Sequence, residues 1–221
     1  MKLHTMKTLQ IFLLLLFASD ASAQVEWKTA FNQAILEKAN TGADASYLNS
    51  KEKELLQLLN LARVAPENFN RSVYQPYLEE RKISQSNYTR SLDRALSQLS
   101  SLAPLIPHQG LTKVAESQAE DLNQSGKVSH YNSSGESPGT RIRKVGNFNM
   151  TAENIDFGNS TPIDILFNLL IDEGVKGVGH RKNLLHPELT HIGVAIGPHP
   201  KYGIMCVQDF AASSTRTEET R

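Results

Sequence analysis

The order of patterns along the sequence predicts an α+β fold, an α-β-α sandwich whose short antiparallel sheet is covered by helices. Stretches with helical periodicity dominate the first half of the chain. A strand pattern, another helix and two apolar strands joined by a Gly- and Pro-rich connector follow. This order is typical of α+β domains rather than of alternating β-α units. The length of 221 residues is enough for one sizeable core.

The first 23 residues have the pattern of a secretory signal peptide. Lys2 and Lys7 precede an unbroken apolar run at 11–18, and Ala21-Ser22-Ala23 is a small-x-small cleavage site that would start the mature chain at Gln24. The run is too short for a membrane anchor, which needs about 20 residues. We therefore expect a secreted or periplasmic protein with no membrane anchor after cleavage.

The next segment, 24–50, is polar, and we expect it to be a leader that packs loosely. A strong helix is then predicted at 51–63, with Ser50 as its N-cap and no capping box, because Lys53 stands where Glu or Gln would close one. Its apolar residues recur at helical spacing on one stripe. They are Leu55, Leu58, Leu59 and Ala62.

The later elements are predicted from periodicity and from Gly and Pro punctuation. Residues 70–90 predict a short helix or an insertion. The other expected elements are a helix at 91–102 that ends before Pro104, a helix at 111–124 stopped by Gly126, a short helix at 140–145, a strand at 150–157, a helix opened by Pro162 and running to 173, and strands at 192–196 and 204–210. The polar tail, 213–221, is expected to be frayed.

Charge and motif content exclude several functional classes. Lys and Arg together number 23, and so do Asp and Glu, so the composition gives no basic excess for binding nucleic acid. The chain has neither a Gly-x-Ser-x-Gly elbow nor a Gly-rich phosphate loop. Cys206 is the single cysteine, and its apolar neighbours predict a buried thiol rather than a reactive one.

Four short motifs after residue 108 carry most of the chemical information. They are Ser125-Gly126-Lys127-Val128-Ser129-His130, Ala152-Glu153-Asn154-Ile155, Leu169-Leu170-Ile171-Asp172-Glu173-Gly174, and Gly179-His180-Arg181-Lys182-Asn183-Leu184-Leu185. Their order and spacing resemble the CAP domain of cysteine-rich secretory proteins, antigen 5 and plant pathogenesis-related proteins, in its bacterial form. The resemblance places this domain at 51–212. The sequence departs from the family in having Ala152 where glycine is usual and in lacking the disulfides of eukaryotic members.

The resemblance implies a cleft shared by His130, Glu153, His180 and one acid from the third motif. Aligning that motif favours Asp172, and Glu173 is the alternative, since a shift of one residue on a helix turns the side chain by about 100°. Two imidazoles and a carboxylate are acceptable zinc ligands, so His130 and His180 are candidate ligands for zinc or another divalent metal. Without a metal, the cluster would be an acid/base set or a hydrogen-bonded scaffold.

Two functions from different classes follow. The favoured one is a binding domain, not an enzyme, whose His/acid cleft takes a small ligand, a metal ion or a partner protein. The alternative is a metal-dependent hydrolase acting on peptide, lipid or glycan, with Glu153 as its base. The basic residues Arg141, Arg143 and Lys144 are expected to form a solvated helix face that could steer an anionic ligand. The other histidines in this half, His108, His186, His191 and His199, are expected in turns, loops or strand edges.

Overall fold

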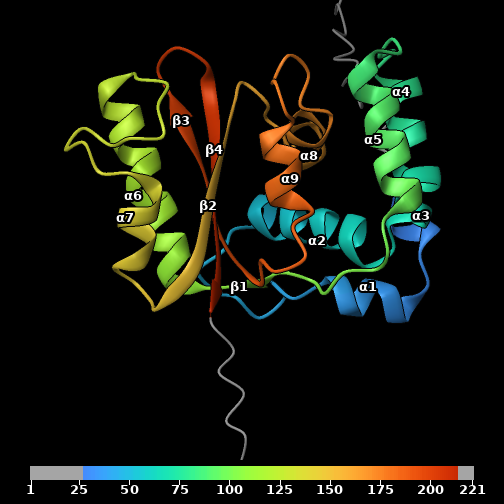
Figure 1. Cartoon of the computed structure of the whole chain (residues 1–221), viewed down its shortest axis with the longest axis horizontal. Helices are drawn as coiled ribbons and strands as arrows, with labels where there is room; N and C mark the ends of the chain where they lie inside the picture. Colours follow the sequence, from blue (N-terminus) through green and yellow to red (C-terminus); the bar gives the residue numbers. More distant parts are fainter. Residues whose placement is uncertain (1–26, 214–221) are drawn as a thin grey trace, which may run out of the picture.

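The sheet at the centre of the molecule has helices on both faces (Figure 1). The computed structural model describes residues 27–213, so the predicted signal peptide and the tail beyond 213 lie outside the described residues. The strands are β1 (Ile106–Pro107), β2 (Phe148–Phe157), β3 (His191–His199) and β4 (Gly203–Ser213), in the order β1-β3-β4-β2. The long strands pair antiparallel, whereas β1 pairs parallel with β3. The predicted α+β class is confirmed, and β1 adds one short parallel pairing.

The helices form a layer on each side of the sheet. Figure 1 shows α6 (Gln109–Ser125) and α7 (Pro138–Arg143) on one side, and α2 (Ser50–Val64), α8 (Pro162–Ile171) and α9 (Gly179–Leu184) on the other. Further helices lie beyond the second layer. They are η1 (Trp27–Ala30), α1 (Gln33–Ala39), α3 (Pro66–Phe69), the π-helical η2 (Asn70–Tyr74), α4 (Gln75–Glu80) and α5 (Asn87–Gln98).

Helix α6 packs directly onto β3 and β4. Gly193 makes this possible, because a Cβ at that position would lie 2.1 Å from the backbone carbon of Leu111. The helix stops at Gly126, which is in the left-handed region with φ 66°, as the sequence predicted. The chain therefore leaves α6 at a fixed point and enters the loop that carries His130.

Helix α2 lies in the main core, but its start differs from the prediction. Asn49, not Ser50, is the N-cap, and its side chain closes a capping box with Glu52. The sequence prediction considered Lys53 as the third helical residue and so missed the box. Glu52 is itself buried, and its second oxygen accepts from the backbone N–H of Ile196 at 3.0 Å. The cap thus also ties α2 to β3.

The segment 24–50 is part of the core, so the expectation of a loosely packed leader is wrong for its described part. Trp27, Phe31 and Leu48 are all buried in the same cluster as α2 and α8. The side-chain amide of Asn60 on α2 also donates to the carbonyl oxygen of Ala39 at 3.1 Å. A few large apolar side chains fixed this segment in place despite its polar composition.

Candidate functional site

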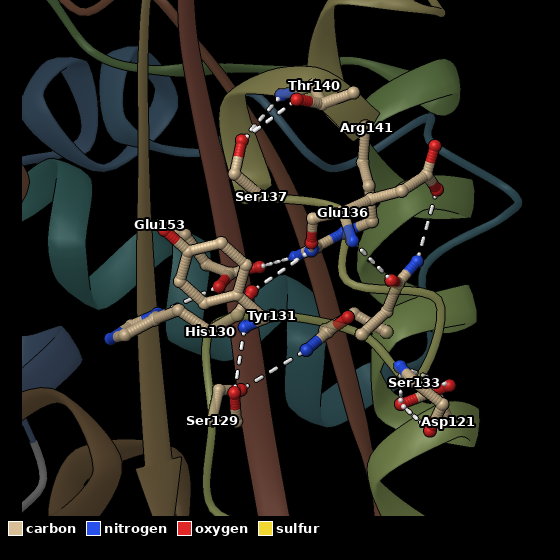
Figure 2. Close-up of polar contacts among 12 residues, drawn as sticks. Asp121, Ser129, His130, Tyr131, Ser133, Glu136, Ser137, Thr140, Arg141 and Glu153 are labelled. Atoms are coloured by element: carbon tan, nitrogen blue, oxygen red, sulfur yellow. Dashed lines mark hydrogen bonds and ion pairs between the residues drawn. The ribbon is translucent and has the colours of Figure 1, made fainter.

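His130 lies in the loop after α6 and points at β2 (Figure 2). Its Nδ1 is 2.8 Å from Oε1 of Glu153, whose side chain is only 1% exposed while that of the histidine is 48% exposed. Because a carboxylate only accepts hydrogen bonds, Nδ1–H is the donor. The neutral ring is then held in one tautomer with the lone pair of Nε2 free.

Arg141 on α7 holds both members of this pair. Its Nη2 is 2.5 Å from Oε2 of Glu153, and its Nη1 donates to the carbonyl oxygens of His130 at 3.0 Å and Glu136 at 2.8 Å. Arg141 is buried, so the expectation of a solvated face is wrong for this residue, whereas Arg143 and Lys144 are exposed.

A second pair joins His180 to Asp172. Nδ1 of His180 is 2.7 Å from Oδ1 of Asp172, and the backbone N–H of His180 donates to Oδ2 at 3.0 Å. Asp172 ends α8 in the left-handed region, which Asp tolerates better than most residues, and its side chain caps the start of α9. Glu173 instead accepts from the hydroxyl of Ser86 at 2.7 Å. Of the two candidate acids, Asp172 is therefore the partner of His180.

Adjacent residues of β2 hold the two pairs. Glu153 contacts His130, and the amide of Asn154 donates to the carbonyl oxygen of His180 at 3.1 Å. Successive side chains of a strand point to opposite faces, so the pairs approach β2 from its two sides. Asn183 donates to the amide oxygen of Asn154 at 2.8 Å and fixes its orientation. Since β2 is an edge strand, both histidines lie at one margin of the sheet.

Two buried carboxyl groups near these pairs belong to no sequence motif. Asp209 faces Glu153 across the β2–β4 ladder, and neither of its oxygens has a hydrogen-bond partner among the described residues. Burial and the charge of Glu153 raise the pKa of Asp209 well above its ordinary value, although Arg141 opposes this. Burial also raises the pKa of Asp156, which accepts from Asn168 and Asn159. The strand pairing brings Asp209 to the site, whereas Asp156 lies on β2 itself.

A comparison with protein families gives a match to the cysteine-rich secretory protein family, CAP, over residues 56–210. The chain belongs to the CAP family. The uncharacterized protein YkwD of Bacillus subtilis is 32% identical over 104 residues, which are 47% of this chain and 38% of YkwD. The chain thus matches less than half of the length of this curated relative.

Solved structures of similar proteins are more distant from this CAP domain. An extracellular protein containing an SCP domain from Bacillus anthracis is 24% identical, with 61% of this chain and 43% of that chain covered and a TM-score of 0.43. The CAP domain of enterococcal PrgA is 17% identical, with coverages of 80% and 84% and a TM-score of 0.36.

The chemistry of His130 and His180 permits a divalent metal, but the described residues offer no zinc site with three protein ligands. Within 27–213, no three or more His, Cys, Asp or Glu side chains are grouped so as to hold a metal ion, whereas a catalytic zinc usually has three protein ligands. His130 and His180 each leave one nitrogen free, which gives at most two ligands. Cys206 adds none, because it is fully buried and burial raises its thiol pKa, in agreement with the predicted buried thiol.

The other histidines of the CAP domain have local roles. His108 caps α6, and its Nδ1 accepts from the backbone N–H of Leu111 at 3.2 Å. His199 is buried at the end of β3 beside the ring of Phe157. The Nδ1 of His186 accepts from the backbone N–H of Glu188 at 3.2 Å. Within the described chain, no helix is both long enough and apolar enough to span a bilayer.

Proposed function

We propose that this protein is an exported CAP-domain binding protein that takes a small ligand, a metal ion or a partner at the margin of β2, between His130 and His180. The export part rests on the signal-peptide pattern of residues 1–23 and on membership of a secretory family. The binding part rests on the two histidine–carboxylate pairs.

The proposal rests on the difference in solvent exposure between the carboxylate and the histidine ring of each pair. The carboxylate side chains of Glu153 and Asp172 are 1% exposed, whereas the rings of His130 and His180 are 48% and 25% exposed. A buried carboxylate fixes the tautomer and the direction of an imidazole, as in the second shell of many binding sites. Each ring therefore offers an oriented Nε2 to a ligand at little further entropic cost.

The contacts of Glu153 disfavour the hydrolase. A general base needs an accessible oxygen within hydrogen-bond reach of the water that it activates. One oxygen of Glu153 is engaged by His130 and the other by Arg141, and the side chain has almost no exposure. Glu153 is thus better suited to orient a histidine than to act as a base.

Zinc is a suitable probe for the two free nitrogens, because a neutral imidazole binds zinc and a protonated one does not. Calorimetric titration should detect zinc binding by the wild type that weakens at acidic pH. His130→Ala/His180→Ala should abolish binding, whereas His186→Ala, the matched control, should not change it. Circular dichroism of the double variant checks its fold. If the wild type binds no zinc at neutral or alkaline pH, the metal part of the proposal is wrong.

A further inference from the structure

A cavity of about 370 Å³ lies between α5 and the helical segment from α3 to α4, on the side of the molecule away from α6 and α7 (Figure 1). Its volume is within the range of about 300–1,000 Å³ that is usual for small-molecule pockets. Among the described residues that line it, Leu78 has the only apolar side chain, and none belongs to the two histidine pairs. The cavity therefore suits a small polar ligand.

One wall of the cavity contains an uncommon helical turn. Residues 70–74 form the π-helix η2, a conformation that occurs mostly as single turns and frequently at functional sites. The backbone N–H of Gln75 bonds to the carbonyl oxygen of Asn70, five residues earlier. This register also brings the two side chains together, and Nε2 of Gln75 donates to Oδ1 of Asn70 at 3.0 Å. The turn thus presents two side-chain amides on the face of the helix that meets α5.

Both amides hold the carboxylate of Asp93 on α5. Nδ2 of Asn70 and Nε2 of Gln75 donate to its Oδ1 at 2.8 Å and 3.0 Å. Asp93 is half-buried, and it has no ion-pair partner among the described residues. Its Oδ2 has no hydrogen-bond partner among them either, but it is not a buried atom, so a ligand in the cavity can reach it. The wall therefore offers an oriented and accessible carboxylate oxygen.

Two arginines on the same cavity also lack an acidic partner. Arg71 and Arg90 line the cavity and are exposed. Within the described chain, their side chains bond only to neutral amide oxygens, that of Asn68 at 3.2 Å for Arg71 and that of Asn87 at 2.7 Å for Arg90. A guanidinium group can bind a carboxylate through two parallel hydrogen bonds. The two side chains are thus available to a carboxylate in the cavity.

Unpaired charges of both signs favour a ligand that carries both. The lining holds two acids, Glu67 and Asp93, besides the two arginines, so its formal charges sum to zero. None of the four forms an ion pair among the described residues. We propose that this cavity binds a free α-amino acid with a polar side chain. Its ammonium group donates to Oδ2 of Asp93, and its carboxylate accepts from the guanidinium groups.

Amide NMR of the whole chain, titrated with L-glutamine, tests this inference. The side-chain amide signals of Asn70 and Gln75 should shift saturably, whereas that of Asn60, which is buried and bonds to Ala39, should not. N-acetyl-L-glutamine lacks the ammonium group and L-glutaminamide lacks the carboxylate. Each analogue should bind about tenfold more weakly than L-glutamine or worse, because it loses a hydrogen bond between charged groups.

Two variants assign the charged groups. Asp93→Asn keeps the oxygen that accepts from the two amides but removes the charge, so it should bind L-glutamine about tenfold more weakly and lose the preference over N-acetyl-L-glutamine. Arg71→Gln/Arg90→Gln should lose the preference over L-glutaminamide. Asp44→Asn, the same change of charge at an exposed position outside the cavity, should leave the affinity unchanged. A merely structural role of Asp93 would weaken all three probes alike.

The inference would be overturned if L-glutamine gave no saturable shift at Asn70 and Gln75, or if D-glucose or either analogue bound the wild type as tightly. An unchanged affinity in Asp93→Asn, or an equal loss for all three probes, would overturn it as well. His130→Ala separates this site from the proposed function, because it removes no lining residue of the cavity. L-glutamine binding should persist in that variant even if zinc binding is lost.

Discussion

At the scale of single residues, the site depends on which buried groups surround each histidine. Glu153 has both oxygens engaged, one by the ring of His130 and one by Arg141, so a single side chain sets the direction of the ring. Asp172 does the same for His180 and also caps the backbone that follows. Orientation by buried acids leaves the exposed ring nitrogens available for binding.

Asp209→Asn tests the electrostatics behind this arrangement. Asp209 faces Glu153 from β4, and Glu153 in turn contacts Arg141 and His130. Its pKa is raised on folding, so the folded state keeps a proton that the unfolded chain releases. The stability that this proton gives is complete below the ordinary Asp pKa and is lost as pH rises toward the raised value. The amide side chain of the Asp209→Asn variant does not titrate, so the variant avoids this loss of stability.

The expected result is a change with pH in the stability difference between the two proteins. Urea unfolding at about pH 4 and about pH 8 should show the variant gaining on the wild type as pH rises, by up to about 1.4 kcal/mol for each pH unit of the window. A difference that is the same at both pH values would mean that Asp209 is ionised in the folded protein.

At the scale of elements, hydrophobic periodicity and the positions of Gly and Pro predicted the helices and strands that depend on nearby residues alone. Helix α6 with its stop at Gly126, strand β2 and the terminal hairpin follow from patterns within a few residues. Helix α5 begins four residues earlier than predicted, at Asn87, because Ser86 caps it. The two-residue β1 has too little pattern to be recognised, and only its pairing with β3 makes it a strand.

The site residues that the sequence predicted lie in local motifs, whereas those that it missed depend on tertiary contacts. The motifs gave His130, Glu153, Asp172 and His180, and the contacts pair them two by two. The role of Arg141 and the presence of Asp209 were missed, because they arise from contacts between separate elements and from strand register. Residue type and spacing alone carry no such information.

Leu59→Ala tests the role of α2 as the core helix. Leu59 is fully buried in the main cluster, in which α2 packs on α8. Removing its side chain should lower the free energy of unfolding by roughly 2–5 kcal/mol, because neighbours fill such a cavity only in part. Lys51→Ala on the exposed start of α2 should change it by less than about 0.5 kcal/mol. Urea unfolding of both variants gives the comparison. Equally small changes in the free energy of unfolding would mean that α2 is not part of the core.

At the scale of the whole molecule, the sheet divides the CAP domain into two helical layers, and its β2 edge is where they both reach the candidate site (Figure 1). Arg141 comes from the α6–α7 layer, whereas Asp172 and His180 come from the α8–α9 layer. The site is thus assembled by the fold as a whole. Loss of the α6–α7 layer would remove Arg141 from the first pair, and loss of the α8–α9 layer would remove the second pair altogether.

The proposed export of the molecule is tested at its N-terminus. If residues 1–23 act as a signal peptide, protein recovered outside the cytoplasm of the producing cell should begin at Gln24. Edman sequencing or intact mass measurement gives the answer directly. An abundant exported form that retains Met1 would contradict the proposal, whatever the outcome for the binding site.

The central claim is that the two histidine–carboxylate pairs form one site across β2, and zinc stoichiometry tests it most directly. Calorimetry of the wild type, His130→Ala and His180→Ala should give one zinc per wild-type chain and loss of most of the affinity in each single variant, because a shared ion needs both nitrogens. Two independent zinc ions per chain, with each variant losing only one of them, would contradict the claim and make the two pairs separate sites.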